Sequence, residues 1–236
     1  MPIAIRKNMK KSFTLLEIIF VIIVIGILAA VIFPRLQTNR VHDAANQILS
    51  HIRYTQHLAL MDDKTNPLKS DWYKSLWQIR FFSRNSASAD GSTAKWAYAV
   101  FSDKDYGSGY NGNLNATTGE VARDPETKKL LSGGYSISYN DPRTYKPAAI
   151  GETYNIVDVK FTSSCSYYRS KRIVFDNLGR PLKGSPENYD KIYHKSKIIQ
   201  NTCFITFCFD NDTCDTNFTI AIEPESGYSY ISSINP

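Results

Sequence analysis

The stretch from residue 13 to residue 33 is almost wholly apolar, and it constrains this 236-residue chain more than any other feature. A helix rises about 1.5 Å per residue, so about 20 residues cross a bilayer core roughly 30 Å thick. The stretch therefore predicts a membrane-spanning helix. Glu17 places a carboxylate inside it, which costs on the order of 2.5–3.5 kcal/mol near a bilayer centre. A charge in that position predicts a function and a partner for Glu17.

Three kinds of segment carry an apolar stretch of this type. A secretory signal peptide ends at a small-residue cleavage site, whereas this stretch ends in residues 33–35, FPR. A simple signal anchor fits the length and the charges but leaves Glu17 and the junction between Ser12 and Phe13 unexplained. Residues 12–17, SFTLLE, resemble the class III signal of type IV prepilins and pseudopilins. We favour this third interpretation, because the junction, the acidic residue, the apolar stretch and a following proline are all in register.

The resemblance implies how the chain is processed. Prepilin peptidase would cut between Ser12 and Phe13, and Phe13 would become the N-methylated first residue. Ser12 stands where the family usually has glycine. The resemblance further implies that Glu17 acts in assembly and that Pro34 kinks the helix.

The function implied is that of a structural subunit. It would be a minor pilin or pseudopilin of a type II secretion or type IV pilus-like fibre, assembled through its N-terminal helix. The expected partners are prepilin peptidase, other pilin or pseudopilin subunits and the inner membrane, with DNA left open. The leader is basic, and positive charge stays cytoplasmic. The expected location is therefore the inner membrane, crossed once, with a periplasmic C-terminal domain, or the fibre after assembly.

Physical chemistry gives Glu17 a specific part in such a fibre. Cleavage before Phe13 would create a free amine four residues from Glu17. The amine of one subunit would neutralise the Glu17 carboxylate of its neighbour. Because the burial penalty is removed only when two subunits stack in one register, this charge pair would specify their alignment.

Beyond Pro34 the sequence predicts a continued helix followed by a β domain. Apolar residues recur at three- and four-residue steps as far as about Met61, which is typical of an amphipathic helix. The fold class expected is α+β, with a long N-terminal hydrophobic helix, membrane-spanning in its first half, packed on a C-terminal antiparallel sheet. The expected parts are a cleaved basic leader (1–12), a transmembrane and assembly half of the helix (13–34), an amphipathic half (35–62) and a soluble β domain (63–236).

Alternating and β-branched residues predict eight strands in the β domain. They are expected at 77–83, 96–102, 134–139, 154–161, 172–176, 203–210, 217–223 and 228–232. The three histidines of the amphipathic half are not spaced as a ligand cluster. We expect them to be exposed or partly packed.

The four cysteines all follow the apolar stretch, in the part expected to face an oxidising compartment, which favours two disulfides. An acidic turn at 210–212 between two expected strands would place Cys208 opposite Cys214. Directly opposed residues lie within disulfide range. We therefore predict Cys208–Cys214, with Cys165–Cys203 as the remaining pair, although four cysteines allow three pairings.

No catalytic motif is present, so the chain is not expected to be an enzyme and no cofactor is expected. Weak candidates for calcium ligands are Asp210, Asp212 and Asp215, which the turn alone also explains. Residues 172–181 are similar to a strand and turn of the GspH/FimT minor pseudopilin domain. That family includes DNA-binding subunits used in transformation, which is the alternative function. The phosphate contacts would then be Arg169, Lys171, Arg172, Arg180 and Lys183.

The bulk charge does not itself indicate DNA binding. Four of the 28 basic residues lie in the leader, so 24 basic residues face 22 acidic ones in the remainder. A chain so near balance does not attract phosphate by net charge.

Overall fold

The computed structural model describes residues 14–84, 95–105, 109–168, 170–191, 193, 195–210 and 213–236, without the side chains of residues 29–39 and 84. The chain divides into two compact units, residues 1–39 and residues 40–236, which we treat separately. The helix α1, Leu15–Met61, contributes to both units.

In the first unit, every described side chain from Thr14 to Leu28 is exposed. Within the described residues, no helix is long and apolar enough to cross a membrane. The expected membrane-spanning half of the helix and the expected single-pass inner-membrane location are therefore wrong.

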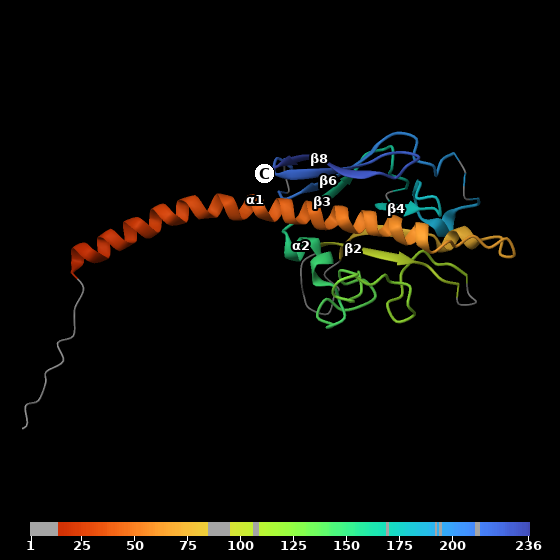
Figure 1. Ribbon diagram of the computed structural model, residues 1–236, viewed down its shortest axis with the longest axis horizontal. Coiled ribbons are helices and arrows are strands. Elements are labelled where there is room, and N and C mark those ends of the chain that lie inside the picture. Colours follow the sequence, from red (N-terminus) through yellow and green to blue (C-terminus); the bar gives the residue numbers. More distant parts are fainter. Residues whose placement is uncertain are drawn as a thin grey trace, which may run out of the picture. The chain divides into compact units, whose positions relative to one another are not determined.

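The strands of the second unit form two antiparallel sheets, whereas the predicted fold class has one (Figure 1). The first sheet has the order β2-β1-β4-β5, with bounds Lys95–Ser102, Trp77–Arg84, Arg172–Phe175 and Pro181–Lys183. The second has the order β3-β6-β7-β8, with bounds Asp158–Phe161, Cys203–Cys208, Asn217–Ile222 and Ser229–Asn235. The fold class changes because β4 pairs with β1, whereas β3, which precedes β4 in the chain, pairs with β6.

Four short helices lie between these elements in the described part of the chain. They are α2 (Ile150–Thr153) and the 3-10 helices η1 (Trp72–Ser75), η2 (Lys146–Ala148) and η3 (Pro186–Asn188). The expected strand at 134–139 is not a strand, and the expected strand at 154–161 begins only at Asp158.

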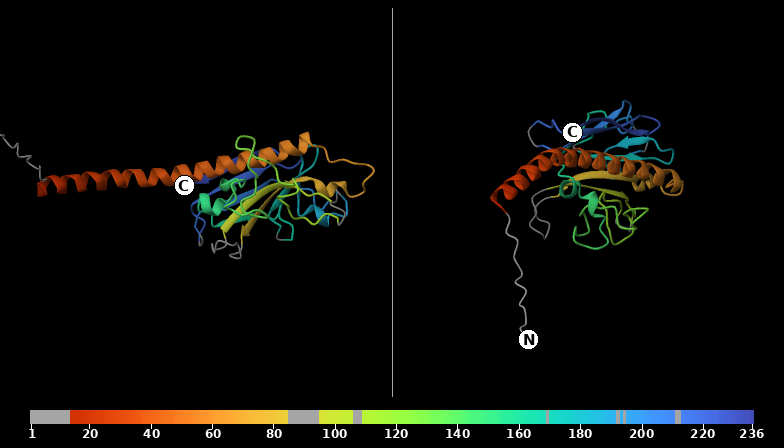
Figure 2. Two further views of the ribbon diagram at one scale, coloured as in Figure 1. Left: turned by 90° about the horizontal axis from the view of Figure 1, so that it is seen from below. Right: turned by 60° about the vertical axis from the view of Figure 1, so that its left-hand side comes forward.

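Residues 40–61 of α1 pack against both sheets (Figure 2). The Gln47 amide donates to the Tyr98 hydroxyl of β2 at 3.0 Å, and the Arg53 guanidinium donates to the carbonyl of Ser229, where β8 begins. The apolar positions of this part of the helix are buried because they recur on one face. They are Val41, Ala44, Ala45, Ile48, Leu49, Ile52 and Ala59.

The sheets also contact each other directly. Phe81 of β1 lies with its ring centre 5.4 Å from that of Phe207 in β6, in an edge-to-face arrangement. The core is therefore continuous from α1 through both sheets.

A second, smaller core lies on the other face of β1 and β2. It joins Ala99 and Phe101 of β2 to apolar residues of the segment 103–145, including Leu114 and Leu130. The first sheet is consequently covered on both faces along part of its length. Side chains of β1 that point away from α1 face this segment.

Candidate functional site

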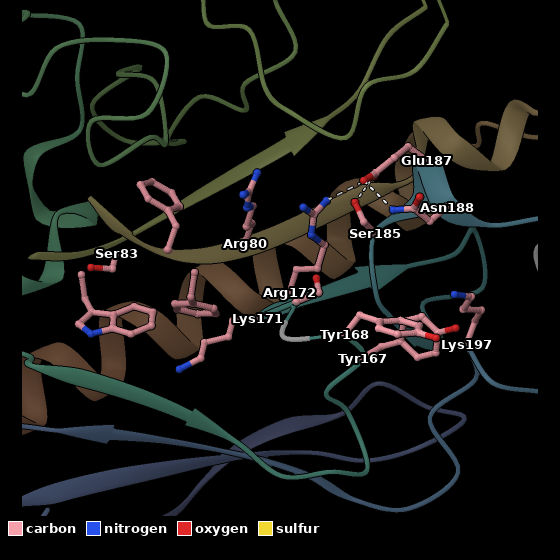
Figure 3. Close-up of a pocket in the computed structure, with 14 residues that line it drawn as sticks. Arg80, Ser83, Tyr167, Tyr168, Lys171, Arg172, Ser185, Glu187, Asn188 and Lys197 are labelled. Atoms are coloured by element: carbon pink, nitrogen blue, oxygen red, sulfur yellow. Dashed lines mark hydrogen bonds and ion pairs between the residues drawn. The ribbon is translucent and has the colours of Figure 1, made fainter. Parts of the chain in front are cut away.

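A cavity of about 780 Å³ lies where β4 leaves β1 (Figure 3). β4 pairs only with Trp77–Arg80 of β1, whereas β1 continues to Arg84. In the described part of the chain, no strand pairs with this edge of β1 beyond Arg80. Phe82 and Ser83 at the uncovered edge line the cavity.

The cavity is rich in cations and in aromatic rings. The described side chains that line it include four basic ones, Arg80, Lys171, Arg172 and Lys197, and one acidic one, Glu187. Trp96, Phe81, Phe82, Tyr167 and Tyr168 supply the rings. Such a composition favours a ligand that carries negative charge and a flat apolar group.

Arg80 and Arg172 are directly opposite each other across the β1–β4 pair. Like charges in opposed positions destabilise an antiparallel pair. The Arg172 side chain is only 7% exposed, and it donates to the Gln78 amide oxygen at 2.7 Å and to the Gly112 carbonyl at 3.2 Å. The nearest Glu187 carboxylate oxygen is 3.9 Å away. Burial, followed by repulsion from Arg80, lowers the pKa of Arg172 to about 10.

Two polar atoms at this wall are buried and lack a hydrogen-bond partner among the described residues. They are Nε of Arg172 and the hydroxyl of Ser170. Burying a polar atom without a partner costs about 1–3 kcal/mol, so native proteins leave few of them. The wall therefore has hydrogen-bonding capacity that the described residues do not use.

Lys197 and two tyrosines form the opposite side of the cavity. The Lys197 ammonium lies 3.5 Å from the centre of the Tyr167 ring, and Lys197 is buried. The Tyr168 ring meets that of Tyr167 edge to face, with ring centres 4.6 Å apart. Tyr168 is 89% exposed. Its backbone φ is 46°, a conformation that bulky residues rarely adopt. Strained backbone conformations are enriched at functional sites of proteins.

The expected DNA contacts do not form one exposed surface. Arg172 is buried, and the Lys171 ammonium donates to the Val159 carbonyl and lies 3.7 Å from the Asp158 carboxylate. Arg180 pairs with Asp176 at 2.8 Å, and Lys183 donates to the Ser164 carbonyl at 2.8 Å. Arg169 lies outside the described residues.

Arg80 and Lys197 were missed by the sequence analysis. Neither belongs to a recognisable motif, since Arg80 lies within an expected strand and Lys197 follows Lys195 in a segment where no strand was expected.

The structure describes two of the three weak calcium candidates, Asp210 and Asp215. Among the described residues, no group of three or more histidine, cysteine, aspartate or glutamate side chains is arranged to hold a metal ion. The Asp210 carboxylate instead accepts hydrogen bonds from the backbone N–H groups of Thr213, Cys214 and Thr216. Asp212 lies outside the described residues. The turn explanation therefore accounts for Asp210.

The two disulfides join the cysteines that the sequence predicts, Cys165 to Cys203 and Cys208 to Cys214. The predicted hairpin register is nevertheless wrong. Cys208 is opposite Asn217 in the β6–β7 pair, and the N–H of Phe209 donates to Thr216. The Asp210 carboxylate holds a wider turn than the one expected, and Cys214 reaches back to Cys208 from within that turn, with φ of 59°.

The expected processing and assembly residues fall mostly outside the described part of the chain. Ser12 and Phe13 are not described, nor is the leader 1–12. Pro34 lies within α1. Its side chain is not among those that the structure describes, so the expected kink stays a prediction. Glu17 is described and exposed, and its backbone N–H donates to Thr14.

His51 is buried in a polar network that the sequence does not reveal. The expectation that the helix histidines are exposed or partly packed is wrong for this residue, which is 5% exposed. Its Nδ1 lies 2.5 Å from the hydroxyl of the buried Tyr98, and its Nε2 lies 3.5 Å from the Asp124 carboxylate. The Tyr145 ring packs edge to face on the imidazole. Burial lowers the pKa of His51, against the opposing effect of Asp124.

We expect stability to fall at acid pH because of His51. Its pKa is lower in the folded chain than in the unfolded one, where it is about 6.5, so below that pH the unfolded chain binds the extra proton. The unfolding free energy should fall with a slope approaching about 1.4 kcal/mol per pH unit until the folded pKa is reached. Urea unfolding between pH 7.5 and 5 measures this slope. His51→Gln should flatten it, whereas His57→Gln, at an exposed position, should leave it unchanged.

No protein family, curated protein or solved structure matches this chain in the comparisons with known proteins.

Proposed function

We propose that this chain is a structural subunit, a minor pilin or pseudopilin of a type II secretion or type IV pilus-like fibre, cut by prepilin peptidase and assembled through its N-terminal helix. The observation that carries the proposal is the exposed apolar surface of Leu15–Leu28, with Glu17 within it. Large exposed apolar patches mark interaction sites, because contact between apolar surface and water is unfavourable.

Other subunits of the fibre are the occupants that best fit this surface. An apolar helix of a second subunit would cover the side chains, and its N-terminal amine would pair with the Glu17 carboxylate. The SFTLLE sequence supports the proposal, because a cut after Ser12 would place that amine at Phe13. Pairing would offset the desolvation of both charges only in one register.

One experiment tests processing and assembly together. Cells with an active prepilin peptidase and its fibre machinery express either the wild-type chain or Glu17→Ala. Mass spectrometry then analyses both the cell membranes and the sheared fibre fraction. The wild-type chain should begin at an N-methylated Phe13. Glu17→Ala should be cut as well as the wild type but be reduced at least tenfold in the fibres.

Two results would refute the proposal. One is a chain that still begins at Met1 in these cells. The other is Glu17→Ala incorporated into fibres as well as the wild type.

The alternative of a DNA-binding subunit for transformation gains no support from its candidate contacts. Of the five, the four described ones are buried or engaged by groups of the protein itself. We do not propose that function on this set.

A further inference from the structure

We propose that the cavity beside β1 and β4 binds a small ligand that carries both a phosphate group and a flat ring, such as a nucleotide. The inference is independent of the fibre function. It rests on two opposed arginines, unused hydrogen-bond capacity and an aromatic rim.

The arginines form the phosphate-binding wall. Arg80 and Arg172 share one face of the β1–β4 pair, and Glu187 is the acidic side chain at the described wall. Glu187 does not cancel both charges, since its carboxylate is 3.9 Å from Arg172 and also accepts from Ser185 and Asn188. Arg80 contacts Asn113 at 3.1 Å and the Tyr135 ring, which are both uncharged. A dianion between the guanidinium groups would convert their repulsion into attraction.

The buried donors add specificity for oxygen ligands. Nε of Arg172 and the Ser170 hydroxyl have no partner among the described residues. A guanidinium presents its N–H groups in a planar fork that matches the oxygens of phosphate. The Lys197 ammonium adds a third cation, held over the Tyr167 ring.

The tyrosines form the part of the cavity that a flat ring would contact. Tyr168 is almost fully exposed and is kept in a strained backbone conformation against Tyr167. An exposed aromatic ring is a surface on which a base stacks, worth about 1–3 kcal/mol per base in proteins that bind single strands. A free nucleotide and a nucleotide unit of a single strand share this chemistry.

Calorimetric titration of the full chain tests the proposal with matched ligands. Thymidine 5′-monophosphate should bind, inorganic phosphate should bind at least tenfold more weakly, and thymidine should not bind measurably. Competition by a short single-stranded oligothymidylate would assign the ligand to a strand, and lack of competition would assign it to a free nucleotide. Absence of binding by the monophosphate would overturn the proposal.

Variants locate the site. Arg80→Gln should weaken monophosphate binding at least tenfold while the melting temperature stays within a few degrees, because a like-charge pair is relieved. Glu187→Gln should strengthen binding severalfold by removing the competing carboxylate. Tyr168→Ala should weaken binding of the monophosphate but not of inorganic phosphate.

Arg143→Gln is the control for general electrostatic attraction. Arg143 is an exposed arginine paired with Asp141 and does not line the cavity. This variant should bind as the wild type does. Equal weakening by Arg143→Gln and Arg80→Gln, or unchanged binding by Arg80→Gln, would overturn the site.

Discussion

Replacing Phe207 with alanine should lower the unfolding free energy by about 3–5 kcal/mol, the range typical of a buried phenylalanine. Phe207 is fully buried in β6. Its ring stacks on that of Phe218 in β7 at 4.7 Å and meets that of Phe81 in the other sheet at 5.4 Å. Removing it would leave a cavity at the contact between the sheets, where neither backbone can easily close the gap.

Phe204 offers a matched control in the same strand. It is three residues before Phe207, on the opposite face of β6, and it is 36% exposed. Phe204→Ala should cost about 1 kcal/mol or less, since less apolar area is involved. Urea unfolding of both variants gives the two free energies. Equal costs would show that Phe207 does not join the sheets as described.

Loss of the Cys165–Cys203 disulfide should be the other large effect. In the chain-entropy model the stabilisation grows with the length of the closed loop. With a sequence separation of 38, this bridge should contribute about 4 kcal/mol, whereas Cys208–Cys214, with a separation of 6, should contribute about 2 kcal/mol. In this model the bridge stabilises the fold by lowering the entropy of the unfolded chain.

Double alanine variants measure this difference without leaving a free thiol. Cys165→Ala with Cys203→Ala should lower the melting temperature more than Cys208→Ala with Cys214→Ala. Cys165 and Cys203 are both fully buried. Part of the loss of stability in their double variant therefore comes from the smaller volume of the alanine side chains. A larger loss for the second pair would contradict the loop-length argument.

Local sequence patterns locate individual strands well in this chain. The alternation in 217–222 and 203–208 predicts β7 and β6, because apolar residues on every second position bury one face of a strand. The segment 134–139 was wrongly expected to be a strand. It begins at the second glycine of the pair Gly133 and Gly134, and it is held by hydrogen bonds between the Ser132 hydroxyl and the Tyr135 backbone. Composition alone does not distinguish such a loop from a strand.

Partner choice between strands was the main failure, and it decides the fold class. Nothing in residues 158–161 indicates that they pair with β6 while residues 172–175 pair with β1. β5, Pro181–Lys183, is too short to give an alternating pattern. The division into two sheets therefore depends on tertiary contacts, and no local sequence pattern predicts it.

The cavity could not be predicted either, because it also depends on which strands pair. Arg80 and Arg172 are 92 positions apart by their numbering, and only the β1–β4 register places them opposite each other. Tyr168 has no special sequence context, and its strained backbone appears only in the fold. In contrast, the predicted cysteine pairs are the ones that form, although the register from which Cys208–Cys214 was inferred is wrong and the turn between the two cysteines is wider than expected.

The Cys165–Cys203 bridge also determines how the chain would respond to mechanical tension. A pulling force applied along the chain passes through the sulfur–sulfur bond and bypasses residues 166–202. At roughly 3.5 Å per residue, about 130 Å of chain is thereby shielded from extension. β4, β5, Tyr168 and Lys197 all belong to this shielded segment. While the bridge is intact, such a force would separate β4 from β1 without extending β4 or β5 themselves.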